Sequence, residues 1–518
     1  MNINKIFTLL AICSIFCLGA ACACQKGGDG TNQQTENGGG GDNGGDNGGG
    51  EVEPPIVKED PPAPYGTLPS KGQVAWQRQE LIMFYHFGPA TFSGYDGDRR
   101  DYTSAQLISA FKPSAVNADQ WVKTAADNGF KEVILTSKHH DGFCLWDNPK
   151  STCDIAACPS PYNVDVVKAV SDACKKYGVN LGIYMSPWDK IGGSDSNYAN
   201  NYIDAIKSIV NGAYGPITEF WLDGHNASGL NFTNVNNAIL ANNPDCVIFS
   251  NVGPGCRWVG NEDGSANETN WSTFSPSAHG ATQRDLPGSY TSYLGQGDEG
   301  GTAWIPAECD FSIQAIGDNN GWFWGSGDSR KTAKQLVDIY YKSVGRNSIF
   351  LMNVPPSQAG VIDDKEKTVI ESFHTMLTQI FAENLAEGAN ITASNERGTG
   401  YEPENMLDGD YDSYFATEDG VNTVTLEFEL DGSKSFNRLV LQEYIPLGQR
   451  IKGFKIETRS SSGSWTSWGN GTKTTIGHKR IILGSRVTTD GVRLTITSSK
   501  ACPTLNGFGL YNDTVSGI

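Results

Sequence analysis

Residues Glu132–Asp141 read EVILTSKHHD, and in this stretch a mostly apolar run passes directly into charged and imidazole side chains. A short apolar run without alternation predicts a strand that is buried on both faces, as in a parallel sheet. Other runs of this kind lie at residues 81–86, 181–185, 217–222, 247–250, 309–313 and 348–352. The sequence from residue 67 to residue 383 therefore predicts one domain built on a parallel sheet.

Helical signatures separate these predicted strands. Ala115–Asn128, Val164–Tyr177 and Asn200–Asn211 read as helices, and a glycine that serves as a stop signal follows each of them. Strand–helix units repeated in this way favour a closed (β/α)8-type barrel over an open sheet. No glycine-rich dinucleotide fingerprint follows the first strand, which weakens the open-sheet alternative.

The texture of the sequence changes after residue 383. Strand-like stretches are then separated by Gly, Ser, Asn and Asp, at residues 423–430, 438–444, 453–459, 480–483 and 492–497. This pattern predicts an antiparallel β-sandwich for residues 384–518. The expected fold class is thus α/β plus all-β, with the barrel first and the sandwich second.

The first 24 residues have the pattern of an export signal. Lys5 supplies a positive end, and Ile6–Ala21 is apolar but shorter than a typical membrane-spanning helix. Small residues and two cysteines follow, as in bacterial lipoprotein signals that are cleaved before a lipidated cysteine. We expect lipidation at Cys22, with Cys24 as the alternative. The protein is then exported and lipid-anchored at the bacterial cell envelope or surface; an ordinary signal would make it periplasmic or secreted.

Residues 25–66 are predicted to form a disordered linker. They are rich in Gly, Asn and Asp and later in Pro and acids, so they cannot bury enough apolar surface to offset the entropy of ordering. The whole chain carries a net charge of −19. This balance argues against nucleic acid as a partner, because binding phosphates requires clustered Lys and Arg. No oligomeric state follows from the sequence.

Polar side chains gather where the predicted barrel strands end. Four of the seven histidines lie at such ends. Because active sites of these barrels lie at the carboxyl ends of the strands, we expect one shared site there. Its candidate side chains are His86, His139, His140, Tyr184, Asp223, Arg257 and Glu262.

Two kinds of chemistry could use such a site. Histidines with acids could bind a metal for hydrolysis, whereas two carboxyl groups could cleave a glycosidic bond while His and aromatic side chains hold the sugar. Adjacent residues on a strand point to opposite sides, so His139 and His140 make poor metal geometry unless the chain twists there. The residues favour the sugar, and no metal is predicted in the barrel.

Several motifs in their order and spacing resemble glycoside hydrolase family 29, the α-L-fucosidases. The string SKHHDGF at residues 137–143 is the most specific of them. The others are YHFG at 85–88, WD at 146–147, FWLDG at 220–224, RWVGNE at 257–262, WIPAECD at 304–310 and NVPP at 353–356. The RWVGNE string is similar to the branch that acts on α-1,3 and α-1,4 fucosyl linkages in branched glycans.

The resemblance implies a retaining mechanism and assigns the catalytic residues. Asp223 would be the nucleophile that attacks the anomeric carbon. Glu262 is the first choice for the acid/base, and Glu308 is the second. The expected partners are fucosylated oligosaccharides or glycoconjugates, and the membrane would be reached only through the lipid anchor.

The resemblance also implies the substrate contacts. His86, His139, His140, Tyr184 and Arg257 match positions that hold the hydroxyls and ring oxygen of fucose. Trp146 belongs to the same motif set, and Trp324, or alternatively Trp322, would pack near the sugar methyl group.

One departure from the family pattern bears on function. Family members often carry Glu-Trp-Gly after the first histidine motif, where this chain has Gly94–Asp98, and the shorter Asp96 would shift a contact to the sugar. The alternatives are therefore a catalytically impaired protein that binds fucosylated glycans, or a fucosidase with another linkage preference.

The C-terminal part resembles the discoidin-like, or F5/8 type C, sandwich and carbohydrate-binding module family 32. Residues 402–410 match an early loop of that module, and residues 436–441 match the next strand. The resemblance implies either a sugar-binding domain or a purely docking domain. It allows one structural Ca²⁺ there and no other cofactor.

Eight cysteines lie beyond the signal. Export permits disulfides, and Cys153 with Cys158 is one candidate pair.

Overall fold

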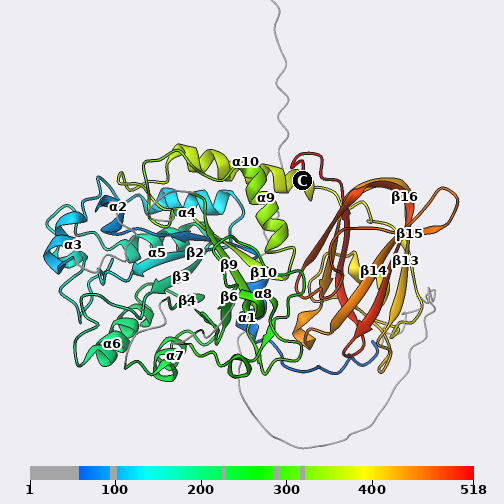
Figure 1. Cartoon of the computed structure of the whole chain (residues 1–518), viewed down its shortest axis with the longest axis horizontal. Coiled ribbons are helices and arrows are strands. Elements are labelled where there is room, and N and C mark those ends of the chain that lie inside the picture. The colour runs from blue at the N-terminus through cyan, green and yellow to red at the C-terminus, as the bar shows by residue number, and fades with distance from the viewer. Residues whose placement is uncertain (1–57, 94–101, 224–228, 284–285, 287–290, 315–320) are drawn as a thin grey trace, which may run out of the picture. The chain divides into compact units, whose positions relative to one another are not determined.

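The computed structural model describes residues 58–93, 102–223, 229–283, 286, 291–314 and 321–518. These residues form a parallel barrel followed by an antiparallel sheet (Figure 1), which confirms the predicted fold class. The predicted signal peptide with Cys22 and Cys24, most of the predicted linker and Asp96 lie outside the described residues.

Eight strands close the barrel in the order β1-β10-β9-β6-β5-β4-β3-β2. Each neighbouring pair is parallel, and β1 closes the ring by pairing with both β2 and β10. The side chains that point inward form a compact cluster that includes Ile82, Ile134, Tyr184 and Trp221. The strands are β1 Leu81–Tyr85, β2 Glu132–Lys138, β3 Asn180–Met185, β4 Glu219–Trp221, β5 Val247–Ser250, β6 Cys256–Trp258, β9 Ala307–Ser312 and β10 Ser348–Asn353.

Strand β6 is the one barrel strand that the sequence pattern did not predict. It has three residues, follows the turn residues 253–255, and carries Arg257 at its centre. A run this short and polar shows neither alternation nor an apolar block, so local pattern cannot identify it. Its pairing with β5 and β9 is set by the closure of the barrel.

The helices between the strands begin and end close to the predicted limits. Helix α5 begins after Asp165, whose side chain accepts a hydrogen bond from the Lys168 backbone N–H at 2.8 Å, and it ends at Gly178 with φ 67°. No helix among the described residues is long and apolar enough to cross a membrane. The α-helices are α1 Lys71–Gln77, α2 Ala90–Ser93, α3 Ser104–Ala110, α4 Ala118–Asp127, α5 Val166–Tyr177, α6 Tyr198–Val210, α7 Phe232–Leu240, α8 Thr291–Gln296, α9 Ala333–Lys342 and α10 Asp364–Ile380.

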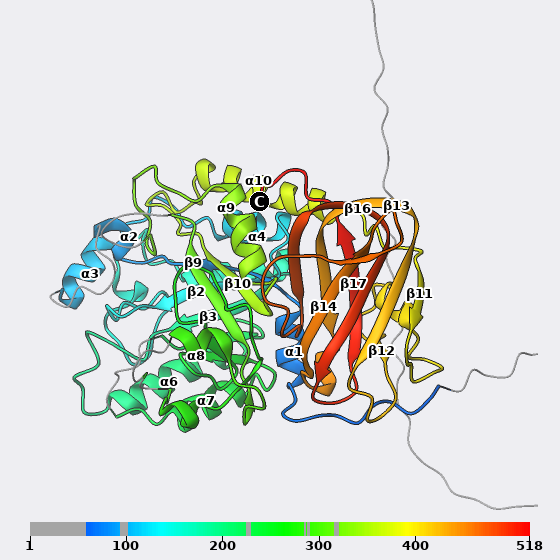
Figure 2. The same ribbon diagram turned by 45° about the vertical axis from the view of Figure 1, so that its right-hand side comes forward.

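The C-terminal sheet has the order β12-β17-β13-β16-β14-β15, and β11 pairs with β13. Figure 2 shows the long strands β13, β16 and β17 side by side, as their antiparallel registers require. Two predicted pairs of strands merge into β13 and β16, because each strand continues through a register shift. The strands are β11 Asn390–Ala393, β12 Phe415–Ala416, β13 Val424–Glu443, β14 Ile451–Arg459, β15 Trp465–Ser467, β16 Arg480–Ser499 and β17 Thr504–Tyr511.

The last residues of the predicted linker are held against this C-terminal part. The Glu59 backbone N–H donates to the Thr399 carbonyl at 2.9 Å, and the Tyr65 N–H donates to the Leu447 carbonyl at 3.0 Å. The prediction of disorder is therefore wrong for residues 58–66. Backbone hydrogen bonds to the C-terminal part order this segment, although its composition offers little apolar surface to bury.

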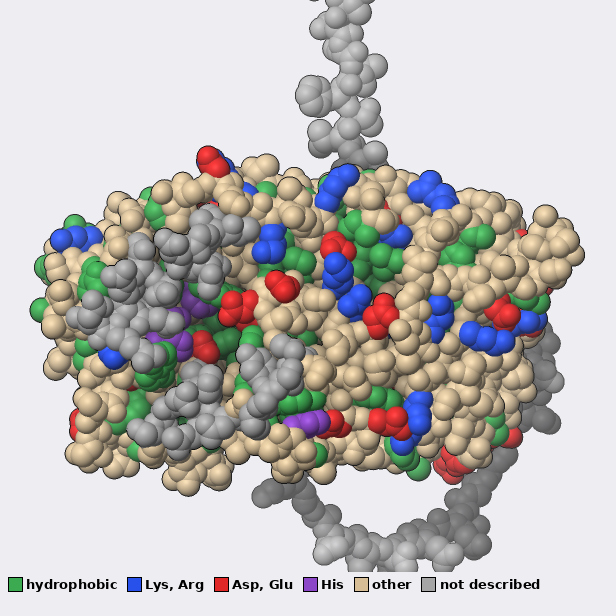
Figure 3. All heavy atoms as spheres, in the orientation of Figure 1, with side chains coloured by type: hydrophobic (Ala, Val, Ile, Leu, Met, Phe, Trp, Pro, Cys, Tyr) green, Lys and Arg blue, Asp and Glu red, His purple; other side chains and the backbone are tan. Residues whose placement is uncertain are grey.

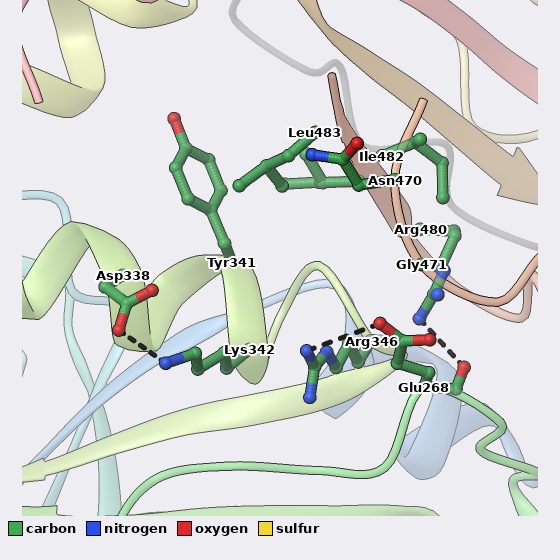
Figure 4. Close-up of a pocket in the computed structure, with 11 residues that line it drawn as sticks. Glu268, Asp338, Tyr341, Lys342, Arg346, Asn470, Gly471, Arg480, Ile482 and Leu483 are labelled. Atoms are coloured by element: carbon green, nitrogen blue, oxygen red, sulfur yellow. Dashed lines mark hydrogen bonds and ion pairs between the residues drawn. The ribbon is translucent and has the colours of Figure 1, made fainter. Parts of the chain in front are cut away.

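The barrel and the C-terminal sheet contact each other within the single unit Ile56–Ile518. A pocket of about 160 Å³ lies at this contact. Figure 4 shows Arg346 from the barrel and Arg480 from the sheet on either side of Glu268. Arg480 donates to the Glu268 backbone carbonyl at 2.8 Å, and Arg346 lies 3.8 Å from its carboxylate. Polar contacts between charged residues thus join the two parts.

All eight cysteines of the described residues are buried free thiols. The candidate disulfide between Cys153 and Cys158 is therefore absent from the structure. Both side chains pack into the core around the barrel.

Candidate active site

Four neighbouring barrel strands deliver polar side chains to one edge. His86 follows β1, His139 and His140 follow β2, Tyr184 lies near the end of β3, and Asp223 follows β4. All four strands are parallel, so these positions lie at the same carboxyl edge of the barrel. Figure 3 shows histidine and acidic side chains together in a hollow on this part of the surface.

Asp223 is the carboxylate that the other side chains surround. The Tyr184 hydroxyl donates to its Oδ2 atom at 2.9 Å, and Nε2 of His140 lies 3.5 Å from the same oxygen. Ser186 donates to the Asp223 backbone carbonyl at 3.0 Å and bonds Nδ1 of His140 at 2.6 Å. The side chain of Asp223 is 36% exposed, so it is oriented by its neighbours and still open to a ligand.

The surroundings keep Asp223 ionised. Desolvation by itself raises the pKa of this carboxyl, but the hydrogen bond from His140, the charge of the imidazoles and the Tyr184 hydroxyl together lower it well below its usual range. A carboxylate that stays charged and partly exposed has the properties of a nucleophile.

His86 is buried with a defined tautomer. Its Nδ1 atom lies 2.9 Å from Oδ1 of Asn353, whose amide group donates to Ser312 and to the Trp322 carbonyl. Because Asn353 presents its oxygen, Nδ1 of His86 carries the proton. Burial lowers the pKa of His86 to about 3, although the bond to Asn353 opposes this, so Nε2 is a neutral acceptor.

A β-bulge in β2 allows His139 and His140 to reach the same group. The register with β3 jumps from Thr136–Tyr184 to Lys138–Met185, so Ser137 is an extra residue. The His139 ring stacks on Tyr184 at 5.5 Å and 6°. Donor atoms of both histidines and of Asp223 lie within 4.8 Å of one another. The expected twist of the chain is present in the form of this bulge.

Glu262 follows β6 and is the second carboxyl of the group. Trp322 Nε1 donates to its Oε2 atom at 3.2 Å. The residue is exposed, yet partial desolvation raises the pKa of Glu262; the bond from Trp322 opposes this rise and the negative charge of Asp223 adds to it. The charge of Asp223 thus acts on Glu262, and the pKa values of the two carboxyls are shifted in opposite directions.

Asp310 is a further acid beside Glu262 that sequence reasoning missed. It is 4% exposed, and Trp258 Nε1 donates to its Oδ1 atom at 2.8 Å. Burial, followed by the charge of Glu262, raises its pKa well above the usual range. Asp310 and Glu308 lie two residues apart on β9 and share its inward face, so strand alternation was the signal that could have found it.

Arg257 does not reach the site, which corrects the prediction that it holds the sugar. Its side chain is fully buried and donates to the backbone carbonyls of Leu294 at 2.8 Å, Trp271 at 3.0 Å and Ile305, and to Asn270. Strand alternation is the cause: Cys256 and Trp258 pack with the inward cluster, so Arg257 points outward from β6.

The tryptophan predictions also change. Trp146 is buried in the core outside the barrel, and its Nε1 atom donates to Ser208 at 3.0 Å, so it is no sugar contact. Trp324 donates to Asp363 at 2.8 Å. The alternative, Trp322, bonds Glu262 and packs 5.1 Å from the ring of His86. The structure therefore places Trp322, rather than Trp324, in the group.

Other aromatic side chains complete the surroundings. Phe323 packs edge-on against His86 at 5.4 Å and against His139 at 5.0 Å, and Trp188 lies 5.0 Å from His140. Phe323 lies between two tryptophans that the sequence analysis weighed, and no spacing singled it out. These rings and the histidines form a mixed apolar and hydrogen-bonding wall, as sugar sites require.

Glu308, the second choice for the acid/base, lies below this group and is 0% exposed. Its Oε2 atom accepts from Trp221 Nε1 at 2.8 Å. A group with no access to solvent cannot exchange a proton with water at the site, so the geometry favours Glu262.

Two histidines and a carboxylate with donor atoms within 4.8 Å are also a set that could hold a divalent metal. In this set Asp223 already accepts from Tyr184, and His140 bonds Ser186. These contacts match the orientation of a nucleophile. That the barrel binds no metal, and that the C-terminal part binds a Ca²⁺, remain predictions.

Comparisons with known proteins agree with this geometry. Residues 72–379 match the family described as Alpha-L-fucosidase, and residues 390–510 match the F5/8 type C domain. The chain is 39% identical to Alpha-L-fucosidase 1 of Arabidopsis thaliana, over 88% of this chain and 90% of that protein. Putative alpha-L-fucosidase 1 of Oryza sativa subsp. japonica is 37% identical, over 88% and 87% of the two chains.

Solved structures show the same likeness in three dimensions. A putative alpha-L-fucosidase from Bacteroides thetaiotaomicron has a TM-score of 0.81 at 34% identity, over 88% of this chain and all of that one. A Ruminococcus gnavus GH29 fucosidase in complex with fucose has a TM-score of 0.78 at 30% identity, over 89% and 98%. The family match, the relatives and the carboxyl edge of the barrel lead to one conclusion: this chain belongs to the alpha-L-fucosidases of glycoside hydrolase family 29, and is a glycoside hydrolase with a C-terminal F5/8 type C domain.

Proposed function

We propose that the protein is an exo-acting, retaining α-L-fucosidase that releases terminal α-1,3- or α-1,4-linked L-fucose from branched glycans. The observation that carries the mechanism is the geometry at the barrel edge, where Tyr184 and His140 hold Oδ2 of Asp223 and Trp322 holds Oε2 of Glu262. In these surroundings the pKa of Asp223 is lowered and that of Glu262 is raised. Pairs of carboxyls whose environments separate their pKa values divide the nucleophilic and acid roles between them.

In the first step, Asp223 attacks the anomeric carbon of fucose. The bond from that carbon to the leaving oxygen breaks, and Glu262 donates its proton to this oxygen. Tyr184 and His140 hold Oδ2 of Asp223, which assigns the attack to Oδ1. The product is a covalent fucosyl ester of Asp223 and the shortened glycan.

In the second step, Glu262 acts as a base. It takes a proton from water, the water oxygen bonds to the anomeric carbon, and the ester bond to Asp223 breaks. Two inversions give net retention. Both catalytic groups return to their starting protonation states.

The remaining side chains hold the sugar. Nε2 of His86 is a neutral acceptor and suits a fucose hydroxyl donor. His139 and His140 add imidazole partners, and Trp322 with Phe323 supplies an apolar surface that suits the fucose methyl group.

A glycan panel tests this proposal. The wild-type protein is incubated with branched Lewis-type, linear 1,2-linked and core-linked fucosylated oligosaccharides and with an aryl fucoside, beside the Asp223→Ala and Glu262→Ala variants. We expect cleavage of the branched 1,3/1,4-linked glycans with retained configuration by NMR, and no turnover by Asp223→Ala. Release of the opposite anomer would refute the mechanism, and cleavage confined to another linkage would refute the specificity.

Export is the other part of the proposal. The sequence pattern at Gly19–Cys24 supports lipidation of Cys22, with Cys24 as the alternative. Intact-mass analysis of membrane-extracted protein should show a diacylglyceryl-modified N-terminal cysteine. If the chain is unmodified and found in the soluble fraction, lipidation is refuted and the segment is an ordinary secretory signal.

A further inference from the structure

Two glutamates lie inside the barrel, below the group that contains Asp223. Glu219 begins β4 and Glu308 lies on β9, and both are 0% exposed. Among the described residues, no Lys, Arg or His forms an ion pair with either carboxyl. Two negative charges in this interior would therefore repel each other without compensation.

The hydrogen bonds around this pair leave one oxygen without a partner. Trp76 Nε1 donates to Oε2 of Glu219 at 2.6 Å, and Trp221 Nε1 donates to Oε2 of Glu308 at 2.8 Å. Cys256 Sγ lies 3.8 Å from Oε1 of Glu219. Oε1 of Glu308 is buried and has no partner among the described residues.

One proton between the two acids accounts for these observations. Carboxyl oxygens of Glu219 and Glu308 lie within 4.8 Å of each other and of the Cys256 sulfur. A protonated carboxyl donates to its neighbour, which gives the unpartnered oxygen a bond and leaves the pair with a single negative charge. Burial raises the pKa of Glu308 to about 8 and that of Glu219 well above its usual range, so the proton stays at neutral pH.

The pair connects to the nucleophile through two aromatic rings. Trp221, which Glu308 holds, stacks on Tyr184 at 5.5 Å and 21°, and Phe249 covers its other face at 3.6 Å and 5°. Tyr184 in turn donates to Asp223 at 2.9 Å. The indole bond to Glu308 fixes the rotation of Trp221 in this stack, and the stack fixes where the Tyr184 hydroxyl points.

We infer that Glu308 is a positioning residue for the reaction, and that with one proton shared with Glu219 it aims Tyr184 at Asp223 through Trp221. The inference rests on the proposed role of Asp223 as nucleophile. It predicts that a substitution at Glu308 acts on the state of Asp223 and not on proton donation to the leaving group.

The test compares Glu308→Gln, Glu308→Ala and Trp221→Phe with wild type, using the pH profile of kcat/KM on an aryl fucoside. Glutamine can accept from Trp221 and donate to Glu219, so Glu308→Gln should stay within about tenfold of wild type. Glu308→Ala should lose about 10²-fold, because misplacement of a catalytic group by 1 Å costs that much. Its acidic limb should move to higher pH, since Asp223 loses the fixed Tyr184 donor.

Glu132→Ala is the matched control. Glu132 is also 0% exposed inside the barrel, where its charge adds to burial in raising the pKa of both Glu219 and Glu308. It bonds Gln79 at 2.6 Å and Thr218 at 2.8 Å and makes no bond to Trp221, so its removal changes the charge near the pair and leaves the bond to the indole in place. It should lower the thermal stability without moving the acidic limb. An equal shift of that limb in Glu132→Ala, or no shift in Glu308→Ala, overturns the inference. If Glu308→Ala does not fold, Trp221→Phe decides in the same way.

Two further readouts distinguish a positioning residue from a general acid and from a metal ligand. Rescue of Glu308→Ala by azide would make Glu308 the general acid, and one equivalent of metal in purified wild type that is lost in Glu308→Gln would make the pair a metal site; either result overturns the inference. If wild type cleaves no fucoside, the proposed function fails by itself. A crystal structure of Glu308→Ala then still tests positioning, with the Tyr184–Asp223 contact expected beyond about 3.5 Å.

Discussion

Replacing Tyr184 by Phe removes one hydroxyl and leaves the ring that stacks on His139 and Trp221. The lost bond is the 2.9 Å contact from the hydroxyl to Oδ2 of Asp223. A hydrogen bond to a charged group contributes about 1.5–3 kcal/mol. Because this bond favours the charged carboxylate, its loss raises the pKa of Asp223.

The expected result is a shift of the acidic limb of kcat/KM. At about 1.4 kcal/mol per pH unit, the limb should move up by about 1 to 2 pH units, and activity below it should fall tenfold per unit. The assay is hydrolysis of an aryl fucoside across the acid range, with thermal unfolding measured beside it.

Tyr202→Phe is the matched control for this prediction. The Tyr202 hydroxyl is also buried and donates to the Met185 carbonyl at 2.7 Å, away from Asp223. Its loss should cost stability and leave the acidic limb in place. An unmoved limb in Tyr184→Phe, with folding intact, would show that Tyr184 does not set the charge of the nucleophile.

Three other predictions follow from contacts of single side chains. Arg257→Lys should lower the free energy of unfolding by about 3 kcal/mol and leave KM unchanged, because the guanidinium holds loop carbonyls. A raised KM with unchanged stability would instead show that Arg257 contacts the sugar. Added azide should restore turnover by Glu262→Ala on a substrate with a good leaving group. If azide rescues Glu308→Ala instead, Glu308 is the general acid. The third concerns stability in acid. Burial by itself raises the pKa of Glu80, but the contacts with Lys479 and His478 outweigh this effect and lower the pKa to about 2. The ionised Glu80 contributes about 3 kcal/mol to the free energy of unfolding above pH 4.5, and this contribution is lost as the pH falls toward 2. Urea unfolding of Glu80→Gln should therefore show lower stability at pH 7 and a weaker dependence on acid pH. The same pH dependence as wild type would contradict the assignment.

Much of the barrel follows from the sequence because buried parallel strands are apolar on both faces. Seven runs are visible in this way, and the polar residues after them lie together once the sheet closes. Asp223 was found by its place at such an end. β6 was missed because three residues with an arginine at the centre carry no pattern, and its existence depends on pairing with strands distant in sequence.

The errors at the site have the same physical origin. Arg257 and Trp146 belong to motifs that lie next to the site in sequence. Strand alternation directs Arg257 onto backbone carbonyls outside the barrel, and the turn after β2 directs Trp146 into the surrounding core. Asp310 was overlooked although it shares a face with Glu308. Motif strings identify which segments approach a site, while the parity of each strand decides which side chains enter it.

The bulge at Ser137 decides which side of the barrel wall the imidazoles after β2 face. Ile134 packs with the inward cluster and Leu135 with the outer core, so unbroken alternation would send His139 outward and Lys138 inward. The extra residue reverses this parity, and Lys138 instead pairs with Asp189 at 3.1 Å on the outside. If Ser137 instead continued the regular alternation of the strand, every catalytic side chain would stay in the sequence but the cation and the imidazole would exchange places. The bulge in this strand is therefore as specific a requirement as the histidines that follow it.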